Sequence, residues 1–180
     1  MYKIVTVRDV IRVPPQKFGM PLKEAVKSSL EDSMEGKSDP TLGIILAIVS
    51  VEKVGEGKIV PEDPSIFYES EFKALVYKPE LHEMVVGEVV DNVEFGAMIR
   101  IGPVDGFVHI SQIMDDFVSY DNKNSVFIGK QTRKTLKEGD KVRARIISIS
   151  WSEQNKIGLT MRQPGLGSLV WIEESKRKKK

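Results

Sequence analysis

The stretch GFVHISQI at residues 106–113 predicts a strand whose two faces differ in chemistry. Because successive side chains of a strand point to opposite faces, Val108 and Ile110 share one face while Phe107 and His109 share the other. An aromatic ring beside a histidine is an unusual pair for a solvated strand face, but it suits the stacking of unpaired bases. The stretch therefore predicts a sheet with an apolar inner face and an outer face that binds single-stranded nucleic acid.

The same alternation of apolar and polar side chains recurs through the C-terminal half of the chain. It predicts five strands, at residues 84–90, 96–101, 106–110, 141–149 and 156–162. A long polar stretch, residues 115–138, separates the third strand from the fourth, and we interpret it as a loop. Five strands with one long connection in that place are typical of an all-β OB-fold barrel. No helix is expected in this half, and the apolar residues 169–172 are expected to form a last strand.

The alternation also sorts the side chains of the barrel into an inner and an outer set. The inner set is apolar and would fill the barrel: Ala97, Ile99, Ile101, Val108, Ile110, Val142, Ala144, Ile146, Ile157, Leu159 and Met161. The outer set also holds Arg100 and Arg162, and a bulge at Gly96 would turn a further ring outward. The predicted RNA-binding residues are Phe95, Met98, Phe107, His109, Arg143, Arg145 and Lys156. Rings stack on bases and cations meet phosphates, so this set supplies both requirements of single-strand binding.

Each of these outer residues also has an ordinary structural interpretation. An outward ring can pack beneath the polar stretch 115–138, a histidine can cap a turn, and outward Arg and Lys side chains commonly protect strand edges. For any one residue alone, the structural interpretation is favoured. For the whole set on one face of a barrel, nucleic-acid binding is favoured.

The N-terminal half has a different pattern, in which a helix follows the first strand. Residues 2–13 alternate and are rich in Val and Ile, and Pro14 ends this strand. An amphipathic helix is predicted between Pro21 and Gly36 because its apolar positions recur at helical spacing. These positions are Leu22, Ala25, Val26, Ser29 and Leu30.

Two further strands complete this half. Residues 42–51 are a continuous apolar run, typical of a buried central strand, and residues 68–76 alternate again. The sequence GEG at residues 55–57 is interpreted as a turn between them. The order strand, helix, strand, strand predicts an α+β domain with one helix on a small antiparallel sheet. The change of pattern near Pro79 predicts two domains, residues 1–79 and residues 80–180.

Composition argues against catalysis, metal binding and membrane insertion. The chain has 180 residues, 41% of them hydrophobic, with no cysteine and only two histidines. No nucleophile–base pair or phosphate-binding glycine loop is evident, and the adjacent Asp115 and Asp116 are interpreted as a solvated loop. The longest apolar run is residues 42–51, about half of a membrane span, and no secretory signal is evident. We expect a noncatalytic cytoplasmic protein without cofactor or metal.

The charge distribution favours local attraction to nucleic acid. The formal net charge is +1, and residues 176–180 are all basic, so the rest of the chain is net negative. Without a positive field over the whole molecule, contact must come from a local patch. The basic tail is interpreted as a solvated segment that attracts RNA without specificity.

Short motifs connect the sequence with a known family. Four lie in the second half: VGEV at 86–89, FGA at 95–97, DGFVHIS at 105–111 and EGDKV at 138–142. Together they resemble the S1 RNA-binding domain, which is built on the OB-fold. Others extend over the whole chain: MYK at 1–3, RVPP at 12–15, FG at 18–19, LGIILAI at 42–48 and LTMRQP at 159–164. With them, the chain resembles the family of E-prime stalk subunits of archaeal RNA polymerases and its eukaryotic counterpart, the seventh subunit of RNA polymerase II.

The resemblance implies that the first domain has a truncated ribonucleoprotein-like fold and docks on the polymerase core. The docking contacts that it implies are Phe18, Gly19, Gly55 and Gly57. In this family, E-prime forms a heterodimer with a small helical protein called F, so some apolar surface of this chain is expected to face such a partner. Candidates are the apolar residues near the 79–84 junction together with Trp151, Leu169, Val170 and Trp171. For Trp171, packing in the core or between the domains is favoured.

The resemblance implies that the second domain binds nascent single-stranded RNA during transcription. Phe95, Phe107 and His109 match the RNA face of the wider S1 family. Met98 stands where a second aromatic residue is common, and Lys156 stands where arginine is common. These departures predict modest, sequence-tolerant and salt-sensitive affinity. Two alternatives stay open: an accessory protein of translation or RNA degradation with the same barrel, and a structural bridge that never touches RNA.

Overall fold

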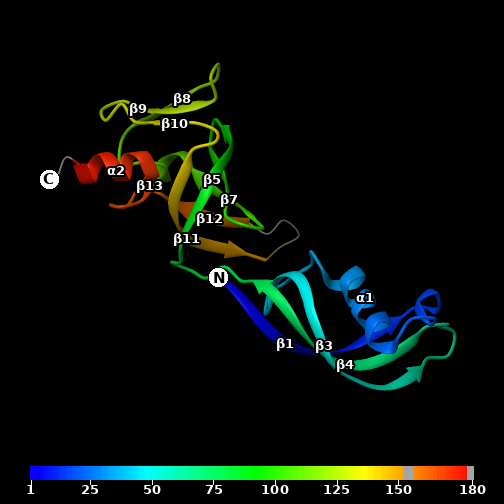
Figure 1. Cartoon of the computed structure of the whole chain (residues 1–180). Coiled ribbons are helices and arrows are strands. Elements are labelled where there is room, and N and C mark those ends of the chain that lie inside the picture. The colour runs from blue at the N-terminus through cyan, green and yellow to red at the C-terminus, as the bar shows by residue number, and fades with distance from the viewer. Residues whose placement is uncertain (152–155, 178–180) are drawn as a thin grey trace. The chain divides into compact units, whose positions relative to one another are not determined.

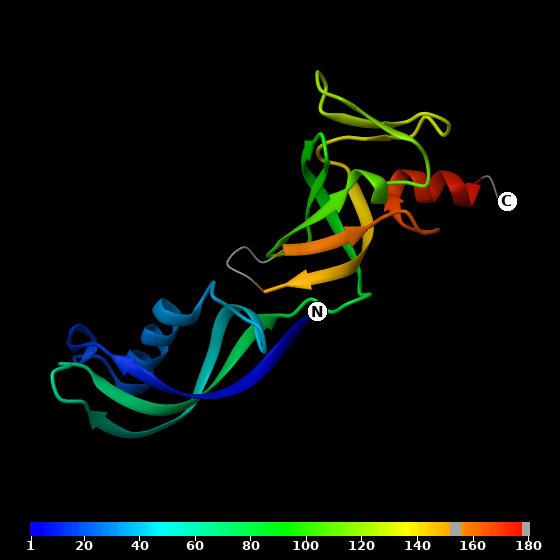
Figure 2. The ribbon, with the colours of Figure 1, turned by 180° about the vertical axis from the view of Figure 1, so that it is seen from behind.

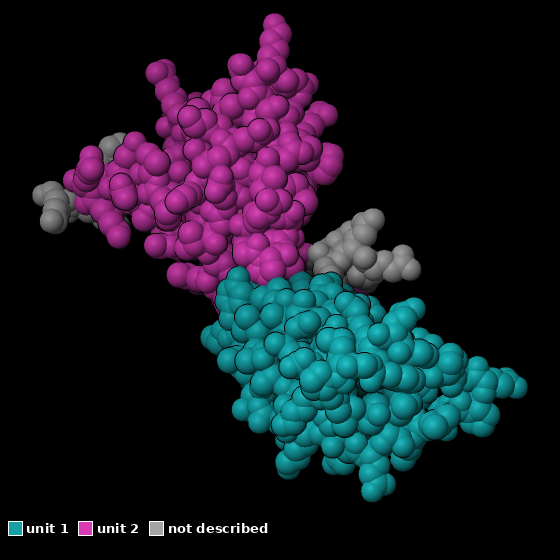
Figure 3. All heavy atoms as spheres, turned by 45° about the vertical axis from the view of Figure 1, so that its right-hand side comes forward, with its two compact units in different colours: residues 1–78 teal, residues 79–180 magenta. Residues whose placement is uncertain are grey.

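The computed structural model describes residues 1–151 and 156–177, and the chain divides into two compact units (Figure 3). Unit 1 comprises residues 1–78 and unit 2 comprises residues 79–180, so the division falls one residue before the predicted boundary. Within the described ranges, no helix is long and apolar enough to cross a membrane. In the same ranges, no three histidine or acidic side chains gather in a way that could hold a metal ion.

Unit 1 is one helix on a four-stranded antiparallel sheet, as predicted (Figure 1). Its elements are β1 (Tyr2–Val13), a 3-10 turn η1 (Pro15–Lys17), α1 (Leu22–Met34), β2 (Ser38–Asp39), β3 (Gly43–Ile59) and β4 (Ile66–Tyr77). The strand order is β1-β4-β3-β2, with β4 paired along its whole length to β1. Figure 2 shows the same arrangement from behind, with α1 lying against one face of the sheet.

The predicted apolar face of α1 packs on the sheet, with one exception at its first turn. Ala25, Val26 and Leu30 are buried and join a core made with the strands, and Phe72 of β4 is fully buried in it. Leu22 is exposed, because it lies at the very start of the helix. The helix ends before Gly36, whose φ of +77° suits a glycine.

The predicted turn at residues 55–57 is wrong, because β3 continues through it to Ile59. The register between β3 and β4 shifts between Val54 and Gly57, which is the signature of a bulge. A Cβ atom on Gly57 would lie 2.8 Å from the ring of Tyr68, so this glycine makes room for a neighbouring side chain. Glycines in a strand pattern here mark an irregular strand and a close approach between strands.

Unit 2 is built around a five-stranded barrel, and all five predicted barrel strands are present. The barrel strands are β5 (Met84–Val93), β6 (Gly96–Arg100), β7 (Asp105–His109), β11 (Lys141–Ser150) and β12 (Lys156–Thr160). The order is β12-β7-β6-β5-β11, and pairing of β11 with β12 closes the barrel. The β7–β12 pair is parallel and the other pairs are antiparallel. The α+β plus OB-type barrel architecture is therefore confirmed.

The predicted inner set fills this barrel. Ten of its members are buried, among them Ile99, Val108 and Ile146, which are fully buried. Ile110 is the exception and is only partly buried. It lies beyond the end of β7, in the 3-10 turn η2 (Ile110–Gln112), where the strict alternation of a strand no longer applies.

The polar stretch 115–138 is a small sheet and not a loop, so that expectation is wrong. It contains β8 (Val118–Asp121), β9 (Val126–Gly129) and β10 (Thr135–Leu136), in the order β10-β9-β8. Phe127 and Leu136 are fully buried and extend the barrel core. Asn92 of β5 fastens the sheet, since its Nδ2 donates to the carbonyl of Ser125 at 2.9 Å and to that of Leu136 at 3.3 Å.

The last apolar segment is a helix, so the predicted strand at residues 169–172 is also wrong. A two-residue strand, β13 (Gly167–Ser168), pairs with β11, and α2 (Leu169–Arg177) follows at once. Trp171 and Ile172 are buried while Val170 is exposed, which is the pattern of a helix with one packed face. Trp171 belongs to the barrel core, and this confirms the packing role favoured for it.

Candidate nucleic-acid interface

Four of the predicted RNA-binding residues lie together on the β6–β7 hairpin and in the turn that leads into it, and we call them the hairpin cluster. The members of the hairpin cluster are Phe95, Met98, Phe107 and His109. Met98 pairs directly with Phe107 across the two strands, and Gly96 pairs with His109. The ring of Phe95 is 62% exposed and lies 5.7 Å, centroid to centroid, from the ring of Phe107. The cluster therefore presents two neighbouring aromatic rings and a flexible thioether on one strand face.

The predicted facing of β7 is confirmed. Val108 is fully buried in the barrel, whereas His109 is exposed and Phe107 is half-buried on the outer side. Gly96 explains the position of the Phe107 ring, because a Cβ atom there would lie 2.4 Å from Cζ of that ring. The ring thus lies over the bare backbone of β6, where it can reach toward Phe95.

His109 has a structural role as well as an exposed ring. Its Nδ1 accepts the backbone N–H of Ser111 at 3.3 Å and lies 2.9 Å from Oγ of the same residue, so the side chain caps η2. The capping interpretation is therefore correct for one edge of the ring. Because Nδ1 acts as an acceptor, the proton of the neutral ring resides on Nε2, which is a donor on the opposite edge.

The two predicted arginines lie on β11, away from the hairpin cluster. Arg143 pairs with Val86 of β5, and Arg145 pairs with Met84 of β5. In the sheet order, β12 separates β11 from β7, and β5 separates it from β6. The structure thus divides the predicted site into an aromatic part and a separate arginine part. The side chain of Lys156, the seventh predicted residue, lies outside the described part of the chain.

Sequence reasoning missed the residues that make the surface beside Phe107 flat. The backbone of Phe107 pairs with Gly158 on β12, and Gly158 pairs with Ser148 on β11. A Cβ atom on Gly158 would lie 2.2 Å from Oγ of Ser148, so any larger residue there would force the Ser148 side chain to move. A glycine inside a strand pattern was the available signal, since it often marks close approach of a ligand or a neighbouring backbone.

The opposite end of the same outer face carries charges of alternating sign. Lys141, Glu88, Arg100 and Asp105 lie opposite one another along four neighbouring strands. Arg100 Nε is 3.1 Å from Oδ1 of Asp105, so these two side chains form an ion pair. These charges largely cancel, and the hairpin cluster therefore depends on stacking more than on a local positive field.

The docking residues predicted in unit 1 lie toward one end of its sheet. Phe18 and Gly19 are exposed in the loop between η1 and α1, and Gly55 and Gly57 lie in β3, near its bulge. Further apolar side chains that sequence reasoning missed are exposed at this end, in the loops and at the adjoining ends of α1 and β3. We call the exposed set the apolar tip: Phe18, Met20, Leu22, Ile59 and Val60. Ile59 is 77% exposed, more than any other large apolar side chain in the described part of the chain.

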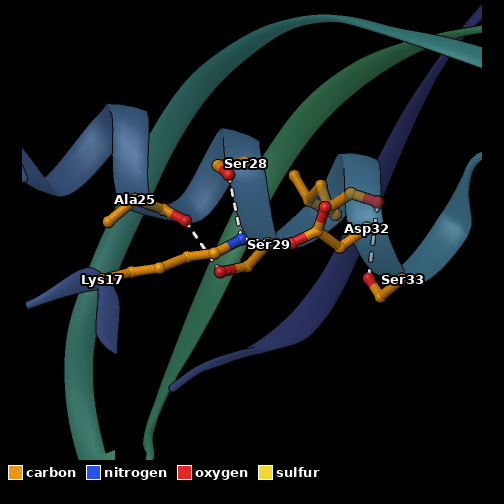
Figure 4. A network of polar contacts seen from close by, with 7 residues as sticks. Lys17, Ala25, Ser28, Ser29, Asp32 and Ser33 are labelled. Atoms are coloured by element: carbon orange, nitrogen blue, oxygen red, sulfur yellow. Dashed lines mark hydrogen bonds and ion pairs between the residues drawn. The ribbon is translucent and has the colours of Figure 1, made fainter. Parts of the chain in front are cut away.

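Two ion pairs fasten the loops of the apolar tip. Asp63 accepts hydrogen bonds from Nε and Nη2 of Arg12, at 3.0 and 3.1 Å, and from the backbone N–H of Ser65. The hydrogen bond from Arg12, followed by that from Ser65, holds the pKa of Asp63 well below its usual range. Lys17 reaches from η1 to Ser28 and Asp32 of α1 (Figure 4). The loops that expose Phe18 and follow Ile59 are thereby tied to the fold.

The fold and the outer face together define an S1-type OB barrel joined to a helix-on-sheet domain. Residues 78–161 match the family model of the S1 RNA binding domain. Residues 8–64 match the SHS2 domain found in the N terminus of Rpb7p/Rpc25p/MJ0397.

Full-length relatives give the family. The chain is 41% identical to DNA-directed RNA polymerase subunit Rpo7 of Saccharolobus shibatae, over 98% of this chain and 100% of that protein. It is 39% identical to the Rpo7 subunit of Sulfolobus acidocaldarius, over 97% of this chain and 96% of the relative. DNA-directed RNA polymerase II subunit RPB7 of Saccharomyces cerevisiae is 31% identical, over 54% of this chain and 58% of the yeast protein. The chain belongs to the Rpo7 family of DNA-directed RNA polymerase subunits.

Proposed function

We propose that this chain is a noncatalytic stalk subunit of RNA polymerase that binds nascent single-stranded RNA on the hairpin cluster. The observation that carries the proposal is the exposed Phe95 ring beside Phe107, with Met98 and His109 on the same strand face. Bases that have left a duplex expose two flat faces, and aromatic rings are the side chains that cover such faces best. The subunit holds the transcript and carries out no chemistry of its own.

Binding is modest and tolerant of sequence. Each ring contributes roughly 1–3 kcal/mol when a base stacks on it, and this gain depends little on which base is present. Met98 covers a base less well than a ring would. The arginines on β11 add attraction to phosphates farther along the strand, so affinity falls as salt rises.

Unit 1 docks on the polymerase core through the apolar tip. Exposure of Phe18 and Ile59 to water is unfavourable for an isolated chain, and the ion pairs of Asp63 and Lys17 hold the neighbouring loops in one conformation. A rigid apolar anchor loses little entropy when it enters a pocket on a partner. The interface therefore needs only a small contact area to be specific.

The small helical partner of the family, the protein called F, covers apolar surface of unit 2. Leu81, Met84 and Val86 are exposed on and just before β5, and Val170 is exposed on α2. Trp171 is not available for this contact because it is buried in the barrel core. An obligate partner of this kind explains why a small unit leaves several large apolar side chains exposed to water.

Binding to a short oligouridylate at low salt tests the RNA part of the proposal. We expect Phe107→Ala to weaken binding about five-fold or more, His109→Ala to weaken it less, and Arg145→Ala to have the smallest effect. Phe95→Ala serves as a second variant because its exposed ring can be removed without disturbing the barrel. Unchanged affinity in all four variants would favour the structural bridge.

Co-purification from a native lysate tests the polymerase part. The full chain is expected to recover the large polymerase subunits and a small helical partner. Recovery of ribosomal proteins or exoribonucleases in their place would contradict the proposal and favour the accessory-protein alternative.

A further inference from the structure

A hollow of about 460 Å3 lies beside η2, the turn that directly follows His109 of the hairpin cluster. Ser111, whose Oγ lies 2.9 Å from Nδ1 of His109, forms part of its wall, together with Ile110, Phe117 and Arg162. The wall of the hollow is therefore hydrogen-bonded to the hairpin cluster through Ser111. At its other side the hollow reaches the small sheet of β8, β9 and β10. A strand of RNA that leaves the hairpin cluster on the side of His109 meets this hollow next.

Phe117 presents an exposed ring on a fixed backbone in this hollow. The side chain is 75% exposed, compared with 62% for Phe95. Its N–H donates to Oδ1 of Asp116 at 2.6 Å, and its carbonyl accepts the N–H of Lys130 at 2.8 Å. A base that stacks on this ring therefore needs no ordering of the backbone that carries it. Packing within the unit does not account for a ring so exposed.

The acidic side chains around the hollow are already occupied within the fold. Asp116 accepts the N–H and the hydroxyl of Thr132, both at 2.8 Å, and these bonds help to hold its pKa below the usual range. Oδ1 of Asp115 lies 2.9 Å from Nε and 2.8 Å from Nη2 of Arg162. The solvated-loop interpretation of the two aspartates is therefore incomplete, since both organise the loop.

Cations line the path beyond Phe117. Arg162 belongs to the walls of this hollow and of a second one, of about 470 Å3, which Lys134 and Lys176 also line. Arginine has five N–H donors, so Arg162 keeps others for a phosphate after two have engaged Asp115. A chain of phosphates running past Phe117 would meet three cationic side chains in succession.

We propose that this hollow is a second RNA subsite, in which a base stacks on Phe117 while the adjoining phosphates contact Arg162, Lys134 and Lys176. The proposal rests on the proposed function, because the same strand must first occupy the hairpin cluster. It assigns to the chain a longer RNA footprint than the barrel hairpin provides alone. The ligand class is single-stranded RNA long enough to span both subsites.

The test compares two lengths of oligouridylate, roughly 4 and roughly 10 nucleotides, on the full chain. We expect Phe117→Ala to weaken binding of the longer RNA about five-fold or more and to leave the shorter RNA unaffected. Phe117→Trp is expected to restore the affinity, because it keeps an aromatic face. Val90→Ala is the matched control, since it removes an exposed apolar side chain of the same unit that lines neither hollow.

The outcomes separate this inference from the proposed function. Phe107→Ala is expected to weaken both lengths. Unchanged affinity for both lengths in this variant and in the three other variants of the oligouridylate test would overturn the proposed function. If Phe107→Ala weakens both lengths while Phe117→Ala matches Val90→Ala, the second subsite alone is wrong. Loss of polymerase association by Phe117→Ala, with RNA affinity unchanged, would assign the ring to a protein contact and also overturn the inference.

Discussion

The hairpin cluster of unit 2 and the apolar tip of unit 1 both expose large apolar side chains, but they are built in opposite ways. In the hairpin cluster, Phe107 stands on a barrel strand whose sheet fixes it, and bare glycine backbone lies beside it. In the apolar tip, Phe18 and Ile59 stand in or beside loops that two ion pairs hold in place. A strand face that carries aromatic rings can stack on a flat base, whereas apolar side chains that project from fixed loops can insert into a pocket on a partner protein.

The comparison teaches that exposure alone does not identify a ligand. Ile59 is more exposed than Phe95, yet only the latter has an aromatic neighbour at stacking distance. What distinguishes the two surfaces is the surrounding chemistry: histidine and glycine around the rings of unit 2, and aliphatic side chains around the tip of unit 1. Variants that damage one surface should therefore leave the function of the other intact.

The largest effect is expected from Gly96→Val, which introduces a side chain where the hairpin cluster packs against bare backbone. A Cβ atom at this position would lie 2.2 Å from the carbonyl oxygen of Val108, a backbone atom that cannot move cheaply. We expect the free energy of unfolding of unit 2 to fall by about 3 kcal/mol. Both tryptophans, Trp151 and Trp171, belong to unit 2, so urea unfolding followed by tryptophan fluorescence reports on that unit.

Gly19→Val is the matched control for this prediction. Nothing lies within 4 Å of the position of its added Cβ atom, and it belongs to unit 1. The tryptophan transition should stay at the wild-type urea concentration in this variant. A Gly96→Val chain that unfolds like wild type would show that the backbone around the hairpin cluster is not as close as described.

The next largest effect is expected when one aromatic ring is removed from each of the two surfaces. Each variant should weaken binding at its own surface only. Phe18→Ala should weaken association with the polymerase core by about 2 kcal/mol, as loss of a central anchor does, and leave affinity for oligouridylate unchanged. Phe95→Ala should weaken RNA binding by about 1 kcal/mol and leave core association unchanged. Measuring both affinities for both variants completes the comparison. A variant that lowers both equally would mean that the two surfaces are not independent.

The smallest effect is expected from the ion pair of the apolar tip. Because the pKa of Asp63 is lower in the folded chain than in the unfolded chain, its contribution to stability is present at neutral pH. That contribution is lost as the pH falls below the unfolded value of about 4 toward the lower folded value. Asp63→Asn should therefore lower the Tm of unit 1 at pH 7, and the difference from wild type should shrink toward pH 3. A difference that grew in acid would contradict the assignment.

The barrel was predictable because alternation in its strands is strict. In β6, in β7 and in residues 141–146 of β11, the inward positions hold Gly, Ala, Val or Ile, whereas the outward positions hold Gly, Met, aromatic, histidine or charged side chains, so facing followed from sequence. The small sheet of β8, β9 and β10 was not predictable in this way. Its strands are two to four residues long, and only Phe127 and Leu136 are fully buried, so no period can be recognised.

Two other differences between the predicted and the observed structure have distinct physical causes. Residues 170–172 are Val, Trp and Ile, which favour strands, but Trp171 packs into the barrel core and Ile172 is buried beside it on one face of a helix. The predicted site is split into two parts in the structure. A sequence shows which face of a strand each side chain occupies, but it does not show the order of the strands in the closed barrel. Arg145 and Phe107 share the outer face, yet β12 lies between their strands.

The most direct test of the account is an NMR titration of the full chain with oligouridylate, observed through the phenylalanine rings and the uracil protons. Stacking on the hairpin cluster predicts ring-current shifts of uracil protons and matching shifts for Phe95 and Phe107, with unit 1 unchanged. Shifts restricted to the basic C-terminal tail or to unit 1, with both rings unaffected, would contradict the claim that this barrel face binds RNA.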